Sequence, residues 1–220
     1  MDAELQRVLT DAVGKGAVRA ASDAVVASNG DAVATIVRIC CDTGTPFSVL
    51  SGTGSKAGSA ATGVLTLDLS KLESVEVHEG ALTLHAQAGA TVASLRSAAD
   101  NARLAVIGLP EKTGAERVGG MLARGEVPRR SLCGIEAVLP TGEVVRTGGG
   151  VLKDVVGYDL AALLLGSMGR LAVVVAATFR LEPARAHTPV PPAPGITADL
   201  AGSVIAGAFD PQGLLRISES

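Results

Sequence analysis

A run of small residues between Pro46 and Ser70 carries the clearest chemical signal in the chain. Residues 51–58 read SGTGSKAG, with glycine at 52, 54 and 58. Backbone N–H groups in such a run can converge on an anion, because small residues leave room and glycine reaches positive φ values. The next residues, 64–69 (VLTLDL), alternate like a strand, whereas the P-loop and Rossmann fingerprints both open a helix. The run therefore predicts a phosphate-binding loop between two strands, with a flexible surface loop as the alternative.

Few side chains have the pattern of a catalytic group. None of the three histidines, His78, His85 and His187, has carboxylates grouped beside it, so ordinary strand or surface histidines are favoured. Arg129 and Arg130 could clamp an anion, although an exposed basic pair is the simpler interpretation. We therefore predict no catalytic residue and no metal site.

Composition excludes several classes of protein. Apolar residues make up 47% of the 220 residues but aromatics only 2%, so the core must be built from Ala, Val and Leu. The net charge of −3, without a basic stripe, argues against a nucleic-acid partner. No apolar run approaches the roughly 18 residues of a membrane span, and the N-terminus lacks a signal peptide's apolar core. The three cysteines, at 40, 41 and 133, lack C-x-x-C spacing. We expect a cytoplasmic protein with buried free thiols.

The periodicity of the chain predicts an α+β fold. Asn29 is expected to cap a helix that Gly44 ends, and Thr91 to cap another. The three strands between residues 64 and 88 are expected to form an antiparallel meander. Helices are expected over 3–13, 32–42, 92–101, 159–165 and 198–208, and strands over 24–28, 47–50, 64–69, 74–78, 81–88, 135–139, 143–146 and 171–181.

Several motifs resemble, in their order, the FAD-binding domain of the vanillyl-alcohol oxidase and p-cresol methylhydroxylase (PCMH) family, and within it the FAD-binding subunit of glycolate oxidase. The longest is VLKDVVGYDLAALLLGSMGRLAVVVAATFRLEP (151–183), which is similar to the family's K-N-V-A-G-Y-D-L…G-S-x-G-x-L-G…R-L-x-P block. The others are SGTGSKAG (51–58), LDLSKL (67–72), AQAGATVASL (86–95), ERVGGMLA (116–123), VLPTGEVVRTGG (138–149) and GAFDPQGLL (207–215).

The resemblance implies a PCMH-type FAD-binding fold, with two small α/β subdomains around mixed and antiparallel sheets. It also implies FAD as cofactor, bound non-covalently because the first loop has no histidine for flavin attachment. A second glycine loop, with Val118, Gly119 and Gly120, would let the backbone approach the flavin, with a tight turn as the alternative. Val173 and Val174 would touch the flavin through main chain, with simple core packing as the alternative. The first loop would wrap the pyrophosphate with Ser51, Gly52, Thr53, Gly54, Ser55, Lys56 and Gly58.

The chain also departs from this family. About 25 residues join Pro183 to Ala208, where the family carries a cap domain that binds substrate, and this is short for a domain. Residues 123–135 are shorter than in the family, and Arg117, Arg170 and Ala172 replace smaller or different residues. We expect an FAD-binding domain at 1–183, a proline-rich linker replacing the cap at 184–197, and a helix and tail returning to the FAD domain at 198–220.

Two functions remain open. The first is a cap-less FAD-binding subunit of a glycolate-oxidase-like D-2-hydroxy-acid dehydrogenase complex, an oxidoreductase subunit that relays electrons and is not active alone. Its partners would be a full-length FAD-linked oxidase subunit and an iron–sulfur subunit, with any membrane association only through them. The alternative is a degenerate, non-catalytic scaffold subunit that has lost FAD. Surface exposed by a missing cap would make the chain an obligate member of a hetero-oligomer.

Overall fold

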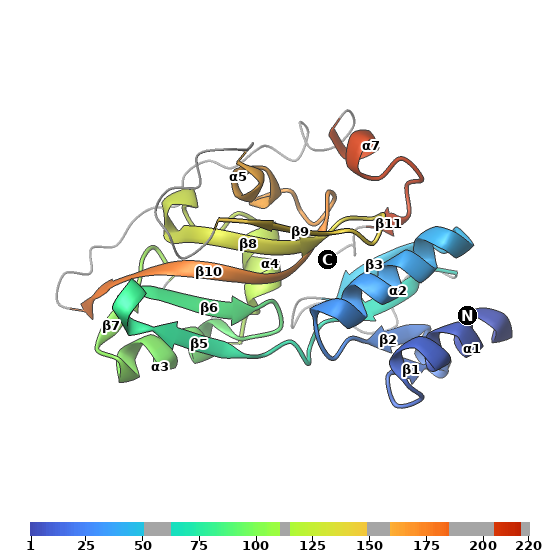
Figure 1. Ribbon diagram of the computed structural model, residues 1–220, viewed down its shortest axis with the longest axis horizontal. Helices are drawn as coiled ribbons and strands as arrows, with labels where there is room; N and C mark the ends of the chain where they lie inside the picture. Colours follow the sequence, from blue (N-terminus) through green and yellow to red (C-terminus); the bar gives the residue numbers. More distant parts are fainter. Residues whose placement is uncertain (51–62, 111–114, 149–158, 185–204, 217–220) are drawn as a thin grey trace.

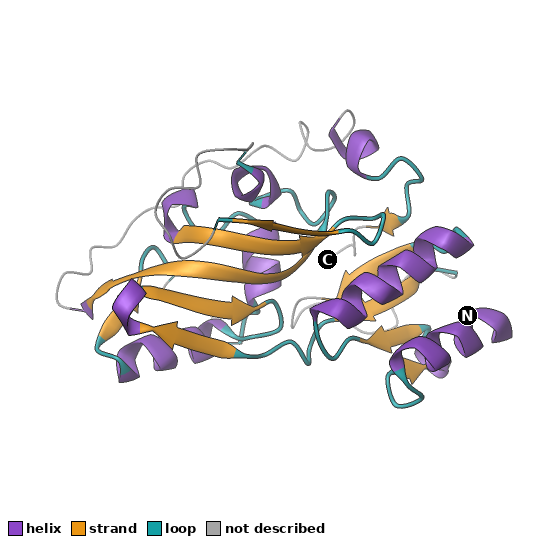
Figure 2. Ribbon diagram, viewed as in Figure 1, coloured by secondary structure: helices purple, strands orange, loops and turns teal. Residues whose placement is uncertain are grey.

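The computed structural model describes residues 1–50, 63–110, 115–148, 159–184 and 205–216. Two lobes lie side by side, each built around its own sheet (Figure 1, Figure 2). We call them the parallel lobe, which contains the N-terminus, and the antiparallel lobe. The fold is therefore α+β with one mixed and one antiparallel sheet, as predicted.

The parallel lobe holds a five-stranded sheet in the order β1-β2-β4-β3-β11. β4 pairs in parallel with both β2 and β3, and β11 adds in parallel to β3. α1 and α2 pack on one face of this sheet (Figure 1). The elements are α1 (Ala3–Val13), β1 (Val18–Arg19), β2 (Ala24–Val26), α2 (Gly30–Thr43), β3 (Phe47–Leu50), β4 (Leu65–Asp68) and β11 (Leu215–Arg216).

The local chemistry of α2 explains its bounds. The side chain of Asn29 accepts a hydrogen bond from the Ala32 N–H at 2.8 Å, and Gly44 ends the helix with φ 64°. The buried residues recur at helical spacing, which confirms the predicted apolar face: Val33, Ile36, Val37 and Cys40. Burial raises the pKa of the Cys40 thiol to about 12, so this thiol stays neutral.

The antiparallel lobe holds a second sheet in the order β5-β6-β10-β8-β9, with β7 also paired to β10. β10 lies at its centre and is antiparallel to β6, β7 and β8. The elements are β5 (Val75–His78), β6 (Thr83–Gln87), α3 (Val92–Asn101), β7 (Leu104–Val106), α4 (Val118–Ala123), β8 (Leu132–Val138), β9 (Val144–Thr147), α5 (Leu160–Leu164), β10 (Val173–Pro183) and α7 (Ala206–Phe209).

Two expectations from the sequence are wrong. β4 is no part of a meander with β5 and β6, because it lies between β2 and β3 in the other lobe and only β5 and β6 form the hairpin. Residues 118–120 form no loop: they open α4, because Val118, Met121 and Leu122 recur at helical spacing and are buried together. The β8–β9 hairpin about residues 140–142 is confirmed.

β10 contributes to the cores of both lobes. Val173 and Val175 are buried among the side chains of the parallel lobe, at 2% and 4% exposure. Beyond the bulge between Val174 and Ala176, the side chains of Phe179 and Leu181 belong to the antiparallel lobe. The first residues of β10 therefore join the two lobes.

Candidate functional site

The carboxyl ends of β2, β3 and β4 form one edge of the parallel sheet. These strands end at Val26, Leu50 and Asp68, and in open α/β sheets ligands bind outside such an edge. β3 runs directly into the predicted phosphate-binding loop. The residues of that loop, Ser51, Gly52, Thr53, Gly54, Ser55, Lys56 and Gly58, lie outside the described residues, so their role stays a prediction.

Backbone hydrogen bonds connect this edge to the antiparallel lobe. The Gly89 N–H donates to the Leu72 carbonyl at 2.7 Å, and the Ala88 N–H donates to the Val175 carbonyl at 2.9 Å. A Cβ on Gly89 would lie 2.2 Å from the Leu69 carbonyl oxygen, so no other residue fits here without backbone movement. The end of β6, the turn after β4 and the start of β10 are thus held together at the junction of the lobes.

The first turn of α4 docks on the same junction. The Val118 N–H donates to the Ala90 carbonyl at 2.9 Å, and the Gly119 N–H donates to the Ala88 carbonyl at 2.8 Å. Val118, Gly119 and Gly120 are all buried. Since the first two amide groups already have acceptors, they are not the donors that would hold an anion. Contact of this turn with a flavin stays a prediction and would involve other atoms.

Arg117, one of the departures from the family, also has a structural partner. It immediately precedes α4 and makes no side-chain cap, and its guanidinium donates to the Gly89 carbonyl. Its charge is therefore used to hold the end of β6.

Val173 and Val174 lie where β10 enters the junction. Their Cα partners on β8 are Val138 and Ala137. The side chain of Val173 is buried in the parallel lobe, whereas Val174 is half-buried against the core of the antiparallel lobe. Their position agrees with main-chain contact to a ligand between the lobes, a role that stays a prediction.

Two buried polar atoms in segments that lead to the junction have no hydrogen-bond partner among the described residues. They are Thr66 Oγ1 on β4, in a residue that is 5% exposed, and Arg170 Nε, three residues before Val173. A buried donor without an acceptor costs about 1–3 kcal/mol. Phosphate, ribose and ring oxygens of a dinucleotide are acceptors that could satisfy them. The donor chemistry of these two residues is thus of a kind that FAD can satisfy.

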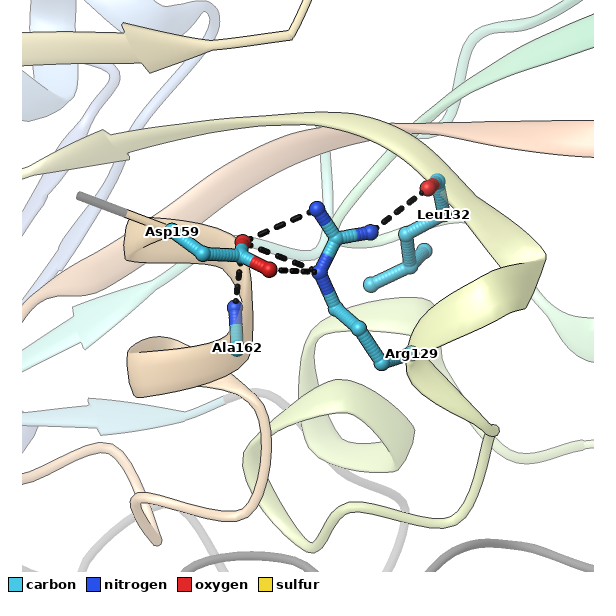
Figure 3. Close-up of polar contacts among 4 residues, drawn as sticks. All are labelled: Arg129, Leu132, Asp159 and Ala162. Atoms are coloured by element: carbon cyan, nitrogen blue, oxygen red, sulfur yellow. Dashed lines mark hydrogen bonds and ion pairs between the residues drawn. The ribbon is translucent and has the colours of Figure 1, made fainter. Parts of the chain in front are cut away.

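Arg129 is not available as a free anion clamp. Its Nε lies 2.9 Å from both carboxylate oxygens of Asp159, and its Nη1 donates to the Leu132 carbonyl at 2.8 Å (Figure 3). Asp159 also caps α5, accepting from the Ala162 N–H at 3.0 Å. The hydrogen bond from Arg129 lowers the pKa of the Asp159 carboxyl. This pair ties the start of α5 to the start of β8.

The histidines make no catalytic cluster among the described residues. His78 is exposed on β5. His85 Nε2 lies 3.7 Å from Glu136 Oε1 across the sheet, and Glu136 also pairs with Arg146 at 3.1 Å. His187 lies outside the described residues. Within the described ranges, no group of three or more His, Cys, Asp or Glu side chains could hold a metal ion.

Comparison with known proteins identifies the class of protein that this fold and junction define. The family model described as FAD binding domain matches residues 22–148, more than half of the chain. The chain belongs to this family, whose cofactor is FAD. In the described residues no helix has the length and apolar character needed to cross a membrane.

Two curated relatives narrow the class. The chain is 32% identical over 174 residues to glycolate oxidase subunit GlcD of Bacillus subtilis, covering 73% of this chain and 37% of that protein. It is 35% identical over 182 residues to D-lactate dehydrogenase of Archaeoglobus fulgidus, covering 76% and 40%. The chain thus spans about two fifths of the length of these relatives. It is an FAD-binding domain related to glycolate oxidase subunits and D-lactate dehydrogenases.

Solved structures support the fold. p-Cresol methylhydroxylase with substrate bound superposes with a TM-score of 0.66 at 18% identity, covering 85% of this chain and 44% of that one. The 4-ethylphenol oxidase of Gulosibacter chungangensis gives a TM-score of 0.67 at 22% identity, covering 82% and 42%. The predicted PCMH-type FAD-binding fold is confirmed.

Proposed function

We propose that this chain is a cap-less FAD-binding subunit of a glycolate-oxidase-like D-2-hydroxy-acid dehydrogenase complex. Two relatives support a multi-subunit setting by their names, glycolate oxidase subunit GlcD and glycolate oxidase subunit GlcE of Escherichia coli, the latter 32% identical over 154 residues. The chain would hold FAD non-covalently and relay the two electrons that a partner removes from a 2-hydroxy acid. The partners would be a full-length FAD-linked oxidase subunit and an iron–sulfur subunit.

The short connection between β10 and α7 carries this proposal. β10 ends at Pro183 and α7 begins at Ala206, so residues 184–205 are all that separates them. Domains need roughly 50 residues or more, so this connection has no room for a substrate-binding domain. The chain after it returns to the parallel sheet as β11 beside β3. This arrangement supports an FAD-binding domain at 1–183, a linker at 184–197 and a returning tail at 198–220.

The cofactor site follows from the same argument. Ser51, Gly52, Thr53, Gly54, Ser55, Lys56 and Gly58 would surround the pyrophosphate, since β3 delivers them to the carboxyl edge of the parallel sheet. On the antiparallel side, the buried first turn of α4 and the main chain of Val173 and Val174 would contact the flavin.

A titration tests the cofactor role. We expect the purified chain, or its complex, to carry flavin absorption and to release FAD on acid treatment. Gly54→Val and Gly58→Val should weaken FAD binding by tenfold or more, on the order of 1.4 kcal/mol, because a branched side chain blocks the backbone from the phosphates. Gly80→Val is the matched control, since a Cβ at Gly80 meets nothing within 4 Å.

A second candidate is the scaffold subunit that has lost FAD. It is favoured by the engaged amide groups of Val118 and Gly119 and by the structural use of Arg117. The two candidates differ in one readout. If the Gly54→Val complex assembles without FAD bound to this chain and keeps its full dehydrogenase activity, the scaffold role is correct and the electron relay is wrong.

The proposal includes assembly with a partner. An FAD-binding domain without a cap leaves one side of the flavin region uncovered, so we expect an interface larger than about 1,200 Å². Expressed alone, the chain should self-associate or aggregate. A stable monomer in size-exclusion chromatography at micromolar concentration would argue against an obligate complex.

A further inference from the structure

Residues 205–216, which we call the strap, contact the cores of both lobes. Ile205, Ala206 and Phe209 pack against the core of the antiparallel lobe. Leu214 and Leu215, which are 6% and 9% exposed, belong to the core of the parallel lobe. Figure 1 shows the strap running from α7, above β9, down to β11 at the edge of the parallel sheet. One short segment therefore bridges the two lobes.

The strap has two anchors, Phe209 in the antiparallel lobe and Leu214–Leu215 in the parallel lobe, and Asp210 holds the turn between them. Its Oδ1 accepts a hydrogen bond from the Leu214 N–H at 3.0 Å, and its Oδ2 accepts from the Leu215 N–H at 2.8 Å. Its backbone carbonyl accepts from the Gly213 N–H at 3.1 Å, and Gly213 has φ 62°. Charge-assisted bonds of this kind are stronger than neutral ones. The carboxylate thus holds Leu214 and Leu215 in the direction that inserts them into the parallel lobe.

The strap docks on the strand that leads to the cofactor site. β11 pairs with β3, and the Phe47 N–H donates to the Leu214 carbonyl at 2.8 Å. β3 ends at Leu50 on the carboxyl edge of the sheet. The other anchor, through Phe209, lies on the lobe that contributes α4 and β10 to the junction. The strap therefore joins the two sides between which the flavin would lie.

Docking of the strap is favoured by apolar burial and opposed by conformational entropy. Its docking buries a few apolar side chains, whose gain is opposed by the conformational entropy of ordering a twelve-residue segment. A ligand that binds the docked state more tightly shifts this equilibrium by its difference in affinity for the two states. FAD prefers the docked state if its site needs both lobes at a fixed spacing.

We propose that docking of the strap is coupled to FAD binding and that Asp210 is the positioning residue for this coupling. The inference rests on the proposed function, in which FAD binds between the lobes. Coupling is reciprocal: the factor by which the docked strap tightens FAD binding equals the factor by which FAD tightens strap docking. Either direction can therefore be measured on the intact chain.

Hydrogen exchange of the Phe47 amide measures docking directly, because its acceptor is the Leu214 carbonyl. With wild-type protein, saturating FAD should slow exchange at Phe47 by about tenfold, a typical coupling. This measurement needs no variant, so it stays decisive if a substituted chain fails to fold. The Ala32 amide, which donates a hydrogen bond to the Asn29 side chain at the start of α2, serves as an internal control. Its exchange should change less on FAD binding.

Two substitutions test the role of the carboxylate. Asp210→Ala should raise the Kd for FAD about tenfold, mainly through faster dissociation, and abolish the FAD effect on Phe47 exchange. Asp210→Asn keeps one acceptor oxygen and should restore part of the coupling. Ala208→Ser, at an exposed position of α7, is the matched control and should leave both readouts unchanged.

The outcomes separate the two proposals. The coupling between strap docking and FAD binding is wrong if FAD binds tightly and leaves Phe47 exchange unchanged. It is also wrong if folded Asp210→Ala has an unaltered Kd for FAD. Neither result contradicts the proposed flavoprotein function. A folded wild-type chain that binds no FAD overturns the proposed function and, with it, this inference.

Discussion

The two lobes differ in how their strands are paired and buried. In the parallel lobe β4 is buried along its whole length, and it lies inside the sheet with β2 on one side and β3 on the other. In the antiparallel lobe β5 and β9 alternate between half-buried and exposed residues, because one face of that sheet meets solvent. In the parallel lobe the strand ends at Val26, Leu50 and Asp68 form the edge where we predict ligand binding, whereas the antiparallel lobe contributes α4 and β10 to the junction.

Glycine has a different purpose in each lobe. In the parallel lobe Gly44 ends α2, and a Cβ there would meet nothing within 4 Å. In the antiparallel lobe Gly148 has φ 68° and a Cβ would lie 1.9 Å from the Cys133 carbonyl oxygen. Backbone conformation alone requires the first glycine, and close contact between strands requires the second. The comparison predicts unequal costs for the same substitution.

The largest expected effect is therefore at Gly148. Gly148→Ala should reduce the free energy of unfolding by about 4 kcal/mol or more, because the β8–β9 backbone must separate to admit the methyl group. Gly44→Ala should reduce the free energy of unfolding by about 1–2 kcal/mol, because an L-residue is strained at left-handed φ. Urea denaturation of both variants checks the contrast. Equal costs would show that the contact at Gly148 relaxes.

The next comparison concerns the cores. Phe47 and Phe179 are both fully buried, one in each lobe. Phe47→Ala and Phe179→Ala should each cost about 3–5 kcal/mol. Because β10 enters both cores, we expect a single unfolding transition in calorimetry for wild type and both variants. Two separated transitions would show that the lobes unfold independently.

Helix caps give a smaller effect in both lobes. Asn29 caps α2 and Thr91 caps α3, each through its side-chain oxygen. Asn29→Ala and Thr91→Ala should each cost about 1 kcal/mol in the free energy of unfolding. Asn29→Asp retains a cap and should be close to wild type. A loss at Asn29→Asp as large as at Asn29→Ala would show that the cap does not explain the effect.

The smallest effect concerns the Arg129–Asp159 pair. The pKa of Asp159 is lowered in the folded chain, so its stabilisation is present above the ordinary carboxyl pKa and is lost as pH falls through the folded value. Asp159→Asn keeps the helix cap but removes the charge. Since both side chains are more than a third exposed, the difference from wild type at pH 7 should stay below about 1 kcal/mol. It should vanish in acid, as measured by urea denaturation across pH. A difference that grows in acid would contradict the assignment.

Local chemistry made much of the fold predictable. Asn29, Gly44 and Thr91 act at single helix ends, and β3 spans the predicted residues 47–50, because caps and short strands depend on nearby residues. The partners of β4 were not predictable, since a period of two shows that a strand exists but not which strands lie beside it. Pairing with β2 and β3 is set by the crossover through α2.

The candidate site shows the same limit. The paired glycines Gly119 and Gly120 suggested a loop, although the spacing of Val118, Met121 and Leu122 already indicated a helix turn. The need for glycine at 89 comes from carbonyls of Leu69 and Leu72, about twenty residues away, and no local pattern reports such a contact. Sequence reasoning thus found the elements around the junction but not their contacts.

The dual role of β10 has a consequence for synthesis on the ribosome. Residues 1–50 of the parallel lobe are translated before any residue of the antiparallel lobe, yet the core of the parallel lobe includes Val173 and Val175 and then Leu214 and Leu215. Contacts between residues so far apart form slowly, since the intervening chain must be closed first. The lobe whose translation starts first is therefore the one whose folding finishes last. Until residue 215 has emerged, the edge of β3 that pairs with β11 stays unpaired, and an unpaired strand edge can pair with other chains.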